Sequence, residues 1–381
     1  MTTTTLAQTP LRAFHTDHSA QLVDFAGWEM PLKYATAVRE EHEQTRRAGS
    51  LFDVSHMGRV AISGLHARRL LERVCSRRIG DMQDGQCRYT LICNDRGGVR
   101  DDVIVMRMEA DEYLVVVNAA NRIKILDHIK AVIADRSFSV KLEDRTEKTA
   151  MVALQGPKVM DLISGVSKEI PTLKRYRFTV KNLMILKLIV SRTGYTGEDG
   201  VEVILPASAV GMAMKLLLKD VDQSKADAVL KPAGLAARDS LRLEAGMPLY
   251  GHELGEEINA LSCGVDFAIS LDKSVERDGE NFIGQDALVR TRDAGGPESK
   301  LVGIKIEGKR TARQGMPILV GGEPSGTVSS GCLSPTLDKS IAMGFVKAAD
   351  SAVGTAVTID AGRATLPGII VPMPFYKAPK N

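Results

Sequence analysis

The amino-acid sequence predicts an α+β protein with antiparallel sheets, followed by a separate antiparallel β-domain at the C-terminus. The first observation is a run of three short strands over residues 87–120, broken at residues 94–98 and 109–112 by turn-forming residues. The second is a set of amphipathic helical patterns on either side of these strands. The third is a change beyond about residue 290, where helical periodicity ends and six short strand patterns recur. We therefore expect a mixed region over residues 1–290 and a small barrel or sandwich over residues 291–381.

Length and composition exclude several classes of protein. The 381 residues are 44% hydrophobic and 25% charged, as in an ordinary globular protein, and a net charge of +3 gives no reason to expect nucleic-acid binding. Five scattered cysteines form no CxxC pair and seven histidines form no HExxH pattern, which argues against disulfides and a metal site. No apolar strip is long enough to span a membrane, and the first residues lack the apolar core of a secretory signal. We expect a cytoplasmic protein, in the bacterial cytosol or in the mitochondrial matrix of a eukaryote.

Two helices are expected before the central strands. The first covers residues 36–48 and stops at Gly49, and a strand over residues 58–63 follows it. The second helix, over residues 65–75, is amphipathic and carries the densest positive charge in the chain. This arginine cluster is either a solvated helix face or a docking surface for an acidic protein, and it comprises Arg68, Arg69, Arg73, Arg77 and Arg78.

Polar side chains stand at the ends of two apolar faces among the central strands. Because side chains alternate along a strand, Asp102 shares a face with Ile104 and Met106, whereas Asp101 lies on the other face. In the third strand Asn118 shares a face with Leu114 and Val116. Burying a lone carboxylate is costly, so a pocket that holds one usually has a use or a partner for it. The alternative is that Asp102 and Asn118 only end their strands and cap turns, and periodicity leaves both interpretations open.

Beyond the central strands, apolar periodicity predicts one helix and two strands, over residues 123–133, 151–157 and 183–191. A loop in the stretch 191–206 then carries three glycines spaced by three residues, at positions 194, 197 and 200. It is neither a GxGxxG motif nor a P-loop, but closely spaced glycines let the backbone approach a ligand, and the loop presents Tyr195 and Glu198. Without further context, a loop of this kind is more often a set of tight turns.

The best-marked helix covers residues 231–246, with Pro232 near its start and Gly246 at its end. Arg238 and Arg242 fall one turn apart on one face, a spacing that can clamp a carboxylate. The alternative is an internal ion pair with a neighbouring acid, and spacing alone favours that alternative.

Nine stretches of the sequence, in order along nearly the whole chain, resemble the aminomethyltransferase family, also called the T-protein of the glycine cleavage system. They are TPLRAFH, VDFAGWEMPLKY, GSLFDVSHMG, NDRGGVRDDVIV, VVNAANR, ALQGP, SRTGYTGEDGVE, GLAARDSLRLEAGMPLYG and CLSPTLDKSIAMG. The resemblance implies two interleaved lobes with antiparallel sheets and a C-terminal β-barrel. It also implies transfer of a one-carbon unit from the aminomethyl-lipoyl arm of H-protein to tetrahydrofolate, with release of ammonia and formation of 5,10-methylene-tetrahydrofolate. No metal, membrane or nucleic acid is implied.

The same resemblance implies roles for individual residues. Glu198 matches the glutamate that binds the pterin ring, and Asp102 matches the acid beside the reacting nitrogens. Because an unshifted aspartate is a weak base at neutral pH, we expect Asp102 to position the folate amine and stabilise developing positive charge. The remaining matches to the folate site are Tyr89, Asn118, Tyr195, Arg238 and Lys377. Several family members have an arginine where this chain has Lys377, which keeps the positive charge but lacks the planar guanidinium for a bidentate contact to the glutamyl tail.

Two other functions fit the same resemblance. One is a tetrahydrofolate-dependent demethylase that takes a methyl group from a sulfonium or a methylated amine. The other is a non-enzymatic folate-binding protein that assists iron–sulfur cluster assembly. Such proteins carry a KGCYxGQE-type segment, and this chain has the cysteine-free LYGHELGEE at residues 249–257 in its place.

Overall fold

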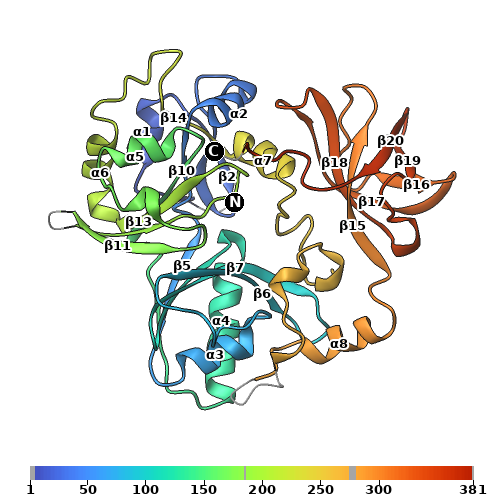
Figure 1. Ribbon diagram of the computed structural model, residues 1–381, viewed down its shortest axis with the longest axis horizontal. Helices are drawn as coiled ribbons and strands as arrows, with labels where there is room; N and C mark the ends of the chain where they lie inside the picture. The colour runs from blue at the N-terminus through green and yellow to red at the C-terminus, as the bar shows by residue number, and fades with distance from the viewer. Residues whose placement is uncertain (1–4, 184–185, 274–279, 380–381) are drawn as a thin grey trace.

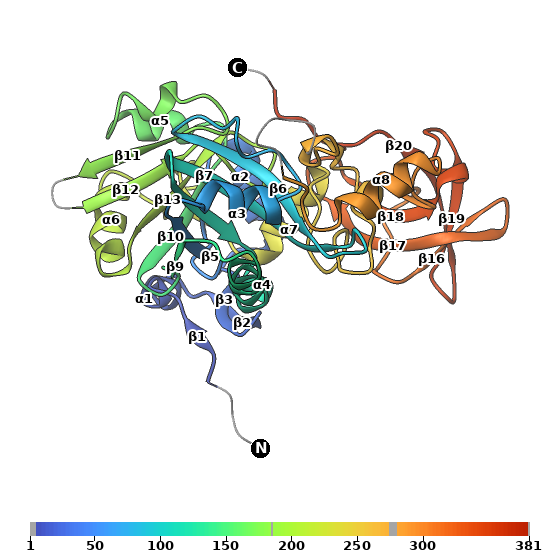
Figure 2. The same cartoon turned by 90° about the horizontal axis from the view of Figure 1, so that it is seen from below.

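The computed structural model describes residues 5–183, 186–273 and 280–379, which form three lobes (Figure 1). The first lobe is built on a six-stranded sheet, the second on a five-stranded sheet, and the third is a closed barrel. In both views the barrel lies to one side of the other two lobes (Figure 1, Figure 2). The predicted α+β class is confirmed, and the C-terminal strands form a barrel, not a sandwich.

The first lobe holds a sheet in the order β11-β12-β13-β10-β4-β14, in which only β14 is parallel to its neighbour. Its strands are β4 (Ser50–Asp53), β10 (Thr149–Gln155), β11 (Phe178–Leu183), β12 (Leu186–Ser191), β13 (Gly200–Pro206) and β14 (Lys231–Pro232). The helices of this part of the chain are α1 (Arg12–Asp17), α2 (Val38–Arg47), α5 (Val159–Ser164), α6 (Val210–Leu217) and α7 (Leu235–Glu244). A small sheet is formed by β1 (Ala7–Gln8), β2 (Gln21–Phe25) and β3 (Trp28–Lys33), and β3 contacts α7.

The second lobe holds an antiparallel sheet in the order β6-β7-β8-β5-β9. Its elements are β5 (Gly58–Ser63), α3 (Ala67–Val74), β6 (Gln86–Cys93), β7 (Val99–Glu109), β8 (Glu112–Val117), α4 (Arg122–Asp135) and β9 (Lys141–Asp144). The three central strands predicted from the sequence are therefore β6, β7 and β8. Helices α3 and α4 cover one face of the sheet, where Val103 and Val105 are buried.

The first two lobes are interleaved along the chain. The chain builds part of the first lobe up to β4. It then forms the second lobe with β5 to β9 and returns to the first lobe at β10. After α7 a later segment packs against β6 and β7 through residues 250–271 and 282–288, so the second lobe is completed by residues from a distant part of the sequence. This segment ends in α8 (Gln285–Asp293), which contains the predicted domain boundary at residue 290; that boundary stays a prediction.

The two sheets meet through a shared apolar core. The face of β7 that carries Ile104 and Met106 packs on Phe52 of β4, Met151 of β10 and Leu241 of α7. Asp102 lies on this same face of β7, directly opposite Leu91 of β6. The alternation of β7 therefore places Asp102 on the sheet face that meets the first lobe, as the sequence predicts.

All six strands predicted after residue 290 are present in the barrel, which has the order β15-β18-β17-β16-β19-β20. They are β15 (Ser299–Ile306), β16 (Pro317–Val320), β17 (Glu323–Ser334), β18 (Lys339–Lys347), β19 (Ala356–Asp360) and β20 (Thr365–Val371). The barrel packs on α7 through Leu243, and the chain then returns to α7, where the Tyr376 N–H donates to the carbonyl of Glu244 at 2.8 Å. Tyr376, near the end of the described chain, therefore lies against the last turn of α7.

The helix predicted over residues 231–246 is shorter in the structure. Lys231 and Pro232 extend beside β4 as β14, and α7 begins at Leu235 after Gly234. The sequence prediction was wrong here because proline suits the first turn of a helix as well as the edge of a sheet. Gly246 does end the helix, with a φ of +64°, the left-handed conformation that glycine adopts most easily. Among the described residues, no helix is long and apolar enough to cross a membrane.

Candidate active site

The carboxylate of Asp102 is held by side chains from two neighbouring strands. The Tyr89 hydroxyl of β6 donates to its Oδ2 at 3.1 Å, and Nδ2 of Asn118 donates to its Oδ1 at 2.7 Å. Asn118 precedes a short 3₁₀ turn and does not cap it with its side chain. The structure thus brings Tyr89, Asp102 and Asn118 together. Asn118 does stand at the end of its strand, but Asp102 lies within β7 and neither side chain caps a turn.

Asp102 sits next to a second carboxylate that is fully buried. Asp101 accepts hydrogen bonds from the Asn118 N–H and from the side-chain amides of Asn118 and Asn121, at 3.1, 2.8 and 2.6 Å. Burial raises the pKa of Asp102 to about 6, and burial together with the charge of Asp102 raises the pKa of Asp101 to about 7. The amide and hydroxyl donors act in the opposite direction on both. Carboxyl groups with pKa values moved towards neutrality are typical of functional sites.

Tyr195 and Arg238 stand beside this group. Burial raises the pKa of Tyr195, and the charge of Asp102 contributes to the same shift, which places the phenol within electrostatic range of the carboxylate. The Tyr195 hydroxyl donates to the carbonyl of Pro248. The guanidinium of Arg238 lies 4.9 Å from the centre of the Tyr195 ring, and its buried Nη1 has no hydrogen-bond partner. A buried, unsatisfied guanidinium N–H is costly, so a ligand acceptor at this point would be bound strongly.

Glu198 lies in a buried ion cluster that joins the glycine-rich loop, α2 and α7 to the barrel. Its Oε1 accepts from Nη1 of Arg46 at 2.9 Å, and Nη2 of Arg46 donates to Oε2 of Glu244 at 2.9 Å. The three side chains are only 3%, 8% and 0% exposed, respectively. Tyr376 stacks on Arg46, with 4.0 Å from the guanidinium carbon to the ring centre, and its hydroxyl donates to Glu198. A carboxylate has about four acceptor positions, so Glu198 retains capacity to bind a further donor.

The glycine-rich loop packs closely against the end of α7, and the point of contact requires glycine. Gly197 has a φ of +82°, and a Cβ there would lie 2.9 Å from the Cβ of Ala245 at the end of α7. The tight loop therefore aligns Tyr195 and Glu198 against the helix that carries Arg238. The predicted close backbone approach is found, although the partner at Gly197 is α7.

The two arginines of α7 do not form a clamp. Arg242 is buried and makes internal contacts with Asp239, Glu253 and Ser330, each at 2.8 Å. The alternative of an internal ion pair is therefore correct for Arg242, and Arg238 alone faces the candidate site. Lys377 is exposed, and its ammonium group makes no polar contact with the residues that the structure describes. Its predicted role in binding the glutamyl tail stays a prediction.

Several arginines of the predicted cluster form ion pairs or hydrogen bonds within the chain. Nη2 of Arg78 pairs with Asp272 at 3.1 Å, and Nη1 of Arg73 donates to the carbonyl of Asn281 at 2.7 Å. Arg69 lies 3.8 Å from a carboxylate oxygen of Glu280. These contacts fix the helix to the segment that completes the second lobe, so they favour a structural role for at least these arginines.

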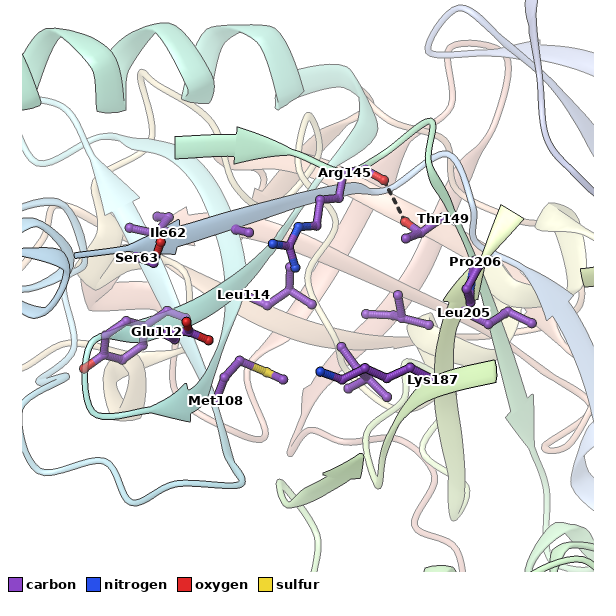
Figure 3. A pocket seen from close by; sticks show the side chains of 14 residues that line it. Ile62, Ser63, Met108, Glu112, Leu114, Arg145, Thr149, Lys187, Leu205 and Pro206 are labelled. Atoms are coloured by element: carbon purple, nitrogen blue, oxygen red, sulfur yellow. Dashed lines mark hydrogen bonds between the residues drawn. The ribbon is translucent and has the colours of Figure 1, made fainter. Parts of the chain in front are cut away.

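A separate cleft of about 280 Å³ opens where the edges of the first two lobes meet (Figure 3). Arg145 and Lys187 extend into it, and its lining includes the apolar side chains of Met108, Leu114 and Ile204. None of the seven predicted site residues lines this cleft, so it is distinct from the candidate site. In the described part of the chain, no group of three or more potential metal-ligating side chains is present.

The comparisons with known proteins agree with this architecture. Residues 11–273 match the model of the GCVT N-terminal domain, and residues 300–377 match the glycine cleavage T-protein C-terminal barrel domain. The chain belongs to the glycine cleavage T-protein family. It is 45% identical over 379 residues to an aminomethyltransferase of Rubrobacter xylanophilus, covering 99% of this chain and 96% of the relative. It is also 39% identical to an aminomethyltransferase of Symbiobacterium thermophilum, with 98% of both chains covered.

A solved structure gives the same result for the fold. The glycine cleavage system aminomethyltransferase T of Bartonella henselae superposes with a TM-score of 0.88 at 29% identity, and the match covers 98% of this chain and 99% of that one. Membership of the T-protein family, which the sequence motifs indicate, is confirmed.

For this T-protein family member, sequence reasoning missed two residues of the candidate site. Arg46 and Tyr376 lie 152 residues before and 178 residues after Glu198, so no local pattern connects them. One signal was available: the helix over residues 36–48 contains a single large apolar residue, Val38, beside a stripe of polar ones. A helix that lacks an apolar face yet packs in a core must bury polar groups, and α2 buries Glu41, His42, Gln44 and Thr45.

Proposed function

We propose that this protein is a tetrahydrofolate-dependent aminomethyltransferase that works with H-protein. It takes the aminomethyl group from the lipoyl arm of H-protein and transfers the methylene carbon to the two amine nitrogens of tetrahydrofolate. The C–S bond to the arm and the C–N bond to the leaving amine break, and two C–N bonds to folate form. The two protons that leave the folate nitrogens are taken up by the thiolate of the arm and by the amine, which departs as ammonia. Atoms and charge balance without an oxidant or a metal ion.

The observation that carries the proposal is the Asp102 carboxylate, which is held on both oxygens by Tyr89 and Asn118 at the lobe interface. A fixed anion there can orient a folate N–H for attack and stabilise the iminium-like cation that forms as ammonia leaves. Its pKa of about 6 also lets it accept a proton more readily than an ordinary aspartate. Asp102 therefore combines positioning with a capacity for proton transfer.

The other site residues would bind the two ends of the folate. Glu198 would accept hydrogen bonds from the 2-amino group and ring N–H of the pterin, each contributing roughly 1.5–3 kcal/mol when partly buried. Arg238 would supply its unpaired N–H groups to an acceptor on the ligand, with Tyr195 packed beside it. Lys377, near the outer end, would meet the anionic glutamyl tail. Tyr89 and Asn118 would contact folate while holding Asp102.

The direct test supplies aminomethylated H-protein and tetrahydrofolate and follows ammonia and 5,10-methylene-tetrahydrofolate together. Asp102→Asn should reduce turnover by about 10²–10³-fold, the usual effect of losing a transition-state electrostatic contact. Asp95→Asn, which removes the same charge at an exposed position in the β6–β7 turn, serves as the matched control and should keep full activity. Full activity of Asp102→Asn would remove Asp102 from the mechanism. Turnover of methylated donors without H-protein, and none with it, would overturn the proposed function in favour of a demethylase.

A further inference from the structure

A single carboxamide joins the two buried carboxylates of β7. Nδ2 of Asn118 lies 2.8 Å from Oδ1 of Asp101 and 2.7 Å from Oδ1 of Asp102, so each of its two N–H bonds faces one carboxylate. Asp101 binds Asn118 a second time through the Asn118 backbone N–H, at 3.1 Å. Asp101 is 0% exposed and lies on the face of the sheet away from the site, where it cannot contact a substrate directly. Its connection to the site runs through Asn118.

This arrangement leaves the Asn118 amide only one favourable orientation. Rotating the amide by half a turn would place its oxygen against two carboxylates, replacing two charge-assisted hydrogen bonds by two repulsive contacts. With both N–H bonds directed to carboxylates, the amide oxygen points away from them and bonds to no residue that the structure describes. If Asp101 were replaced by an amide, that amide could bond to either the N–H or the oxygen of the Asn118 side chain. The preferred orientation of the Asn118 amide would then depend on Asp102 alone.

We propose that Asp101 is a positioning residue for the reaction: it locks the Asn118 amide so that its N–H holds Asp102 and its oxygen is free to accept from a substrate N–H. The inference rests on the proposed function, because it assigns a role at that same site. Asp101 does not touch the substrate and is not a catalytic residue. A second buried acid next to Asp102 lowers the stability of the fold, and the positioning role explains why the chain has an acid at this place.

Asp101 and Asp102 ionise in linked steps. The titratable groups around Asp102 are Asp101 on its own strand, Tyr89 on β6, Tyr195 on the glycine-rich loop and Cys263 in the segment that completes the second lobe. Burial and the charge of Asp102 raise the pKa of Asp101 to about 7, so Asp102, with a pKa of about 6, ionises while Asp101 is still protonated. Losing the lock on Asn118 weakens the hydrogen bond from its amide to ionised Asp102, and Asp102 should therefore ionise at higher pH.

The test measures kcat between pH 5 and 8 for Asp101→Asn, with aminomethylated H-protein and tetrahydrofolate as substrates. We expect kcat to fall about tenfold at pH 7.5, a usual size for a lost hydrogen-bond orientation, and the acid limb of the profile to move upwards, in the direction expected for loss of the Asn118 donor. A purely structural role would lower the folded fraction and leave the acid limb in place, which would overturn the proposal. Asn121→Ser is the matched control: it removes a donor to Asp101 that does not contact Asp102, and its acid limb should stay close to that of the wild type.

A double-mutant cycle shows whether Asp101 acts through Asn118. Asn118→Ala should lower kcat about tenfold or more and move the acid limb upwards, because Asp102 loses a donor to its charged form. Adding Asp101→Asn to Asn118→Ala should cost little further kcat; fully multiplicative losses would overturn the coupling. Should Asp101→Asn fail to fold, an unchanged kcat for Asn118→Ala would overturn the proposal by itself. Absence of wild-type turnover would instead overturn the proposed function, and this inference with it.

Discussion

Arg46 offers the sharpest test of how the candidate site is supported. Its guanidinium donates to Glu198 and Glu244, both at 2.9 Å, to the Thr196 carbonyl at 2.7 Å, and stacks on the Tyr376 ring. Replacing it by methionine keeps much of the packing volume and removes the cation. We expect Arg46→Met to destabilise the protein strongly and to weaken folate binding at the same time.

The magnitude follows from burial. Removing one partner of a buried ion pair leaves an uncompensated charge, which costs about 3–5 kcal/mol. Glu244 keeps other partners, since the Thr336 N–H at 3.1 Å and the Ser334 hydroxyl also donate to it. Burial raises the pKa of Glu244, but these donors, His42 and Arg46 together bring it to about 2. Its ionised form therefore stabilises the fold fully above the unfolded pKa near 4.5, and this contribution is lost as the pH falls towards 2. Measurements at pH 7 report the full effect.

The assay is urea denaturation at pH 7, combined with calorimetric titration of folinic acid into each folded variant. Arg46→Met should lose about 3–5 kcal/mol of unfolding free energy and bind folinic acid at least tenfold more weakly, because Glu198 loses the group that orients it. Arg39→Met is the matched control from the same helix: its ion pair with Glu43 is 58% and 46% exposed, so it should change stability by less than about 1 kcal/mol. A loss of under 1 kcal/mol for Arg46→Met, or unchanged folinic acid binding, would refute this account of the cluster.

Three further predictions concern the site and its surroundings. Because Asp102 acts as a carboxylate with a pKa raised to about 6, kcat should fall as the pH drops below about 6. Its ionisation opposes folding, and this cost grows from the unfolded pKa of 3.8 to the folded pKa of about 6 and is complete above it, so Asp102→Asn should gain about 1 kcal/mol of stability at pH 7 and none near pH 4, as thermal denaturation at the two pH values will measure. Arg242→Leu leaves the buried Glu253 without its cation and should lose about 3–5 kcal/mol in urea denaturation, and a neutral result would show that this pair is dispensable. Lys377→Ala should change stability by less than about 0.5 kcal/mol and raise the KM for polyglutamylated tetrahydrofolate about threefold, whereas an unaltered KM would exclude a contact to the tail.

The parts of the fold that sequence reasoning found are those determined by local patterns. Strand alternation correctly separated Asp101 from Asp102, because the side-chain period of a strand is fixed by its backbone geometry. The six barrel strands were found because each lies between glycine or proline turns. The interleaving of the first two lobes came from the family resemblance, since no local pattern shows that β10 returns to pair with β4.

The features that escaped prediction depend on contacts between distant residues. Spacing on α7 could not distinguish Arg238 from Arg242, because the difference lies in Glu253 and Ser330, which approach only one of them. The family resemblance predicts Glu198 as a pterin-binding residue, but its cation, Arg46, comes from α2. Asp101 was placed on the correct face, yet its bond to Asn118 depends on the register between the ends of β7 and β8. Such polar partners are fixed by tertiary packing, and periodicity carries no information about them.

The polar groups at the two ends of the site are supported in different ways, and this difference has a consequence for function. At the Asp102 end, the support comes from the neighbouring strands β6, β7 and β8, which belong to one sheet. At the Glu198 end, Arg46 and Glu244 link the loop to α2, α7 and the barrel residues Ser334 and Thr336, so the position of Glu198 depends on how the lobes are packed together. A shift of the barrel relative to α7 would therefore disturb Glu198 before it disturbed Asp102. Substitutions at the barrel contact should consequently weaken pterin binding while leaving the ionisation of Asp102 unchanged.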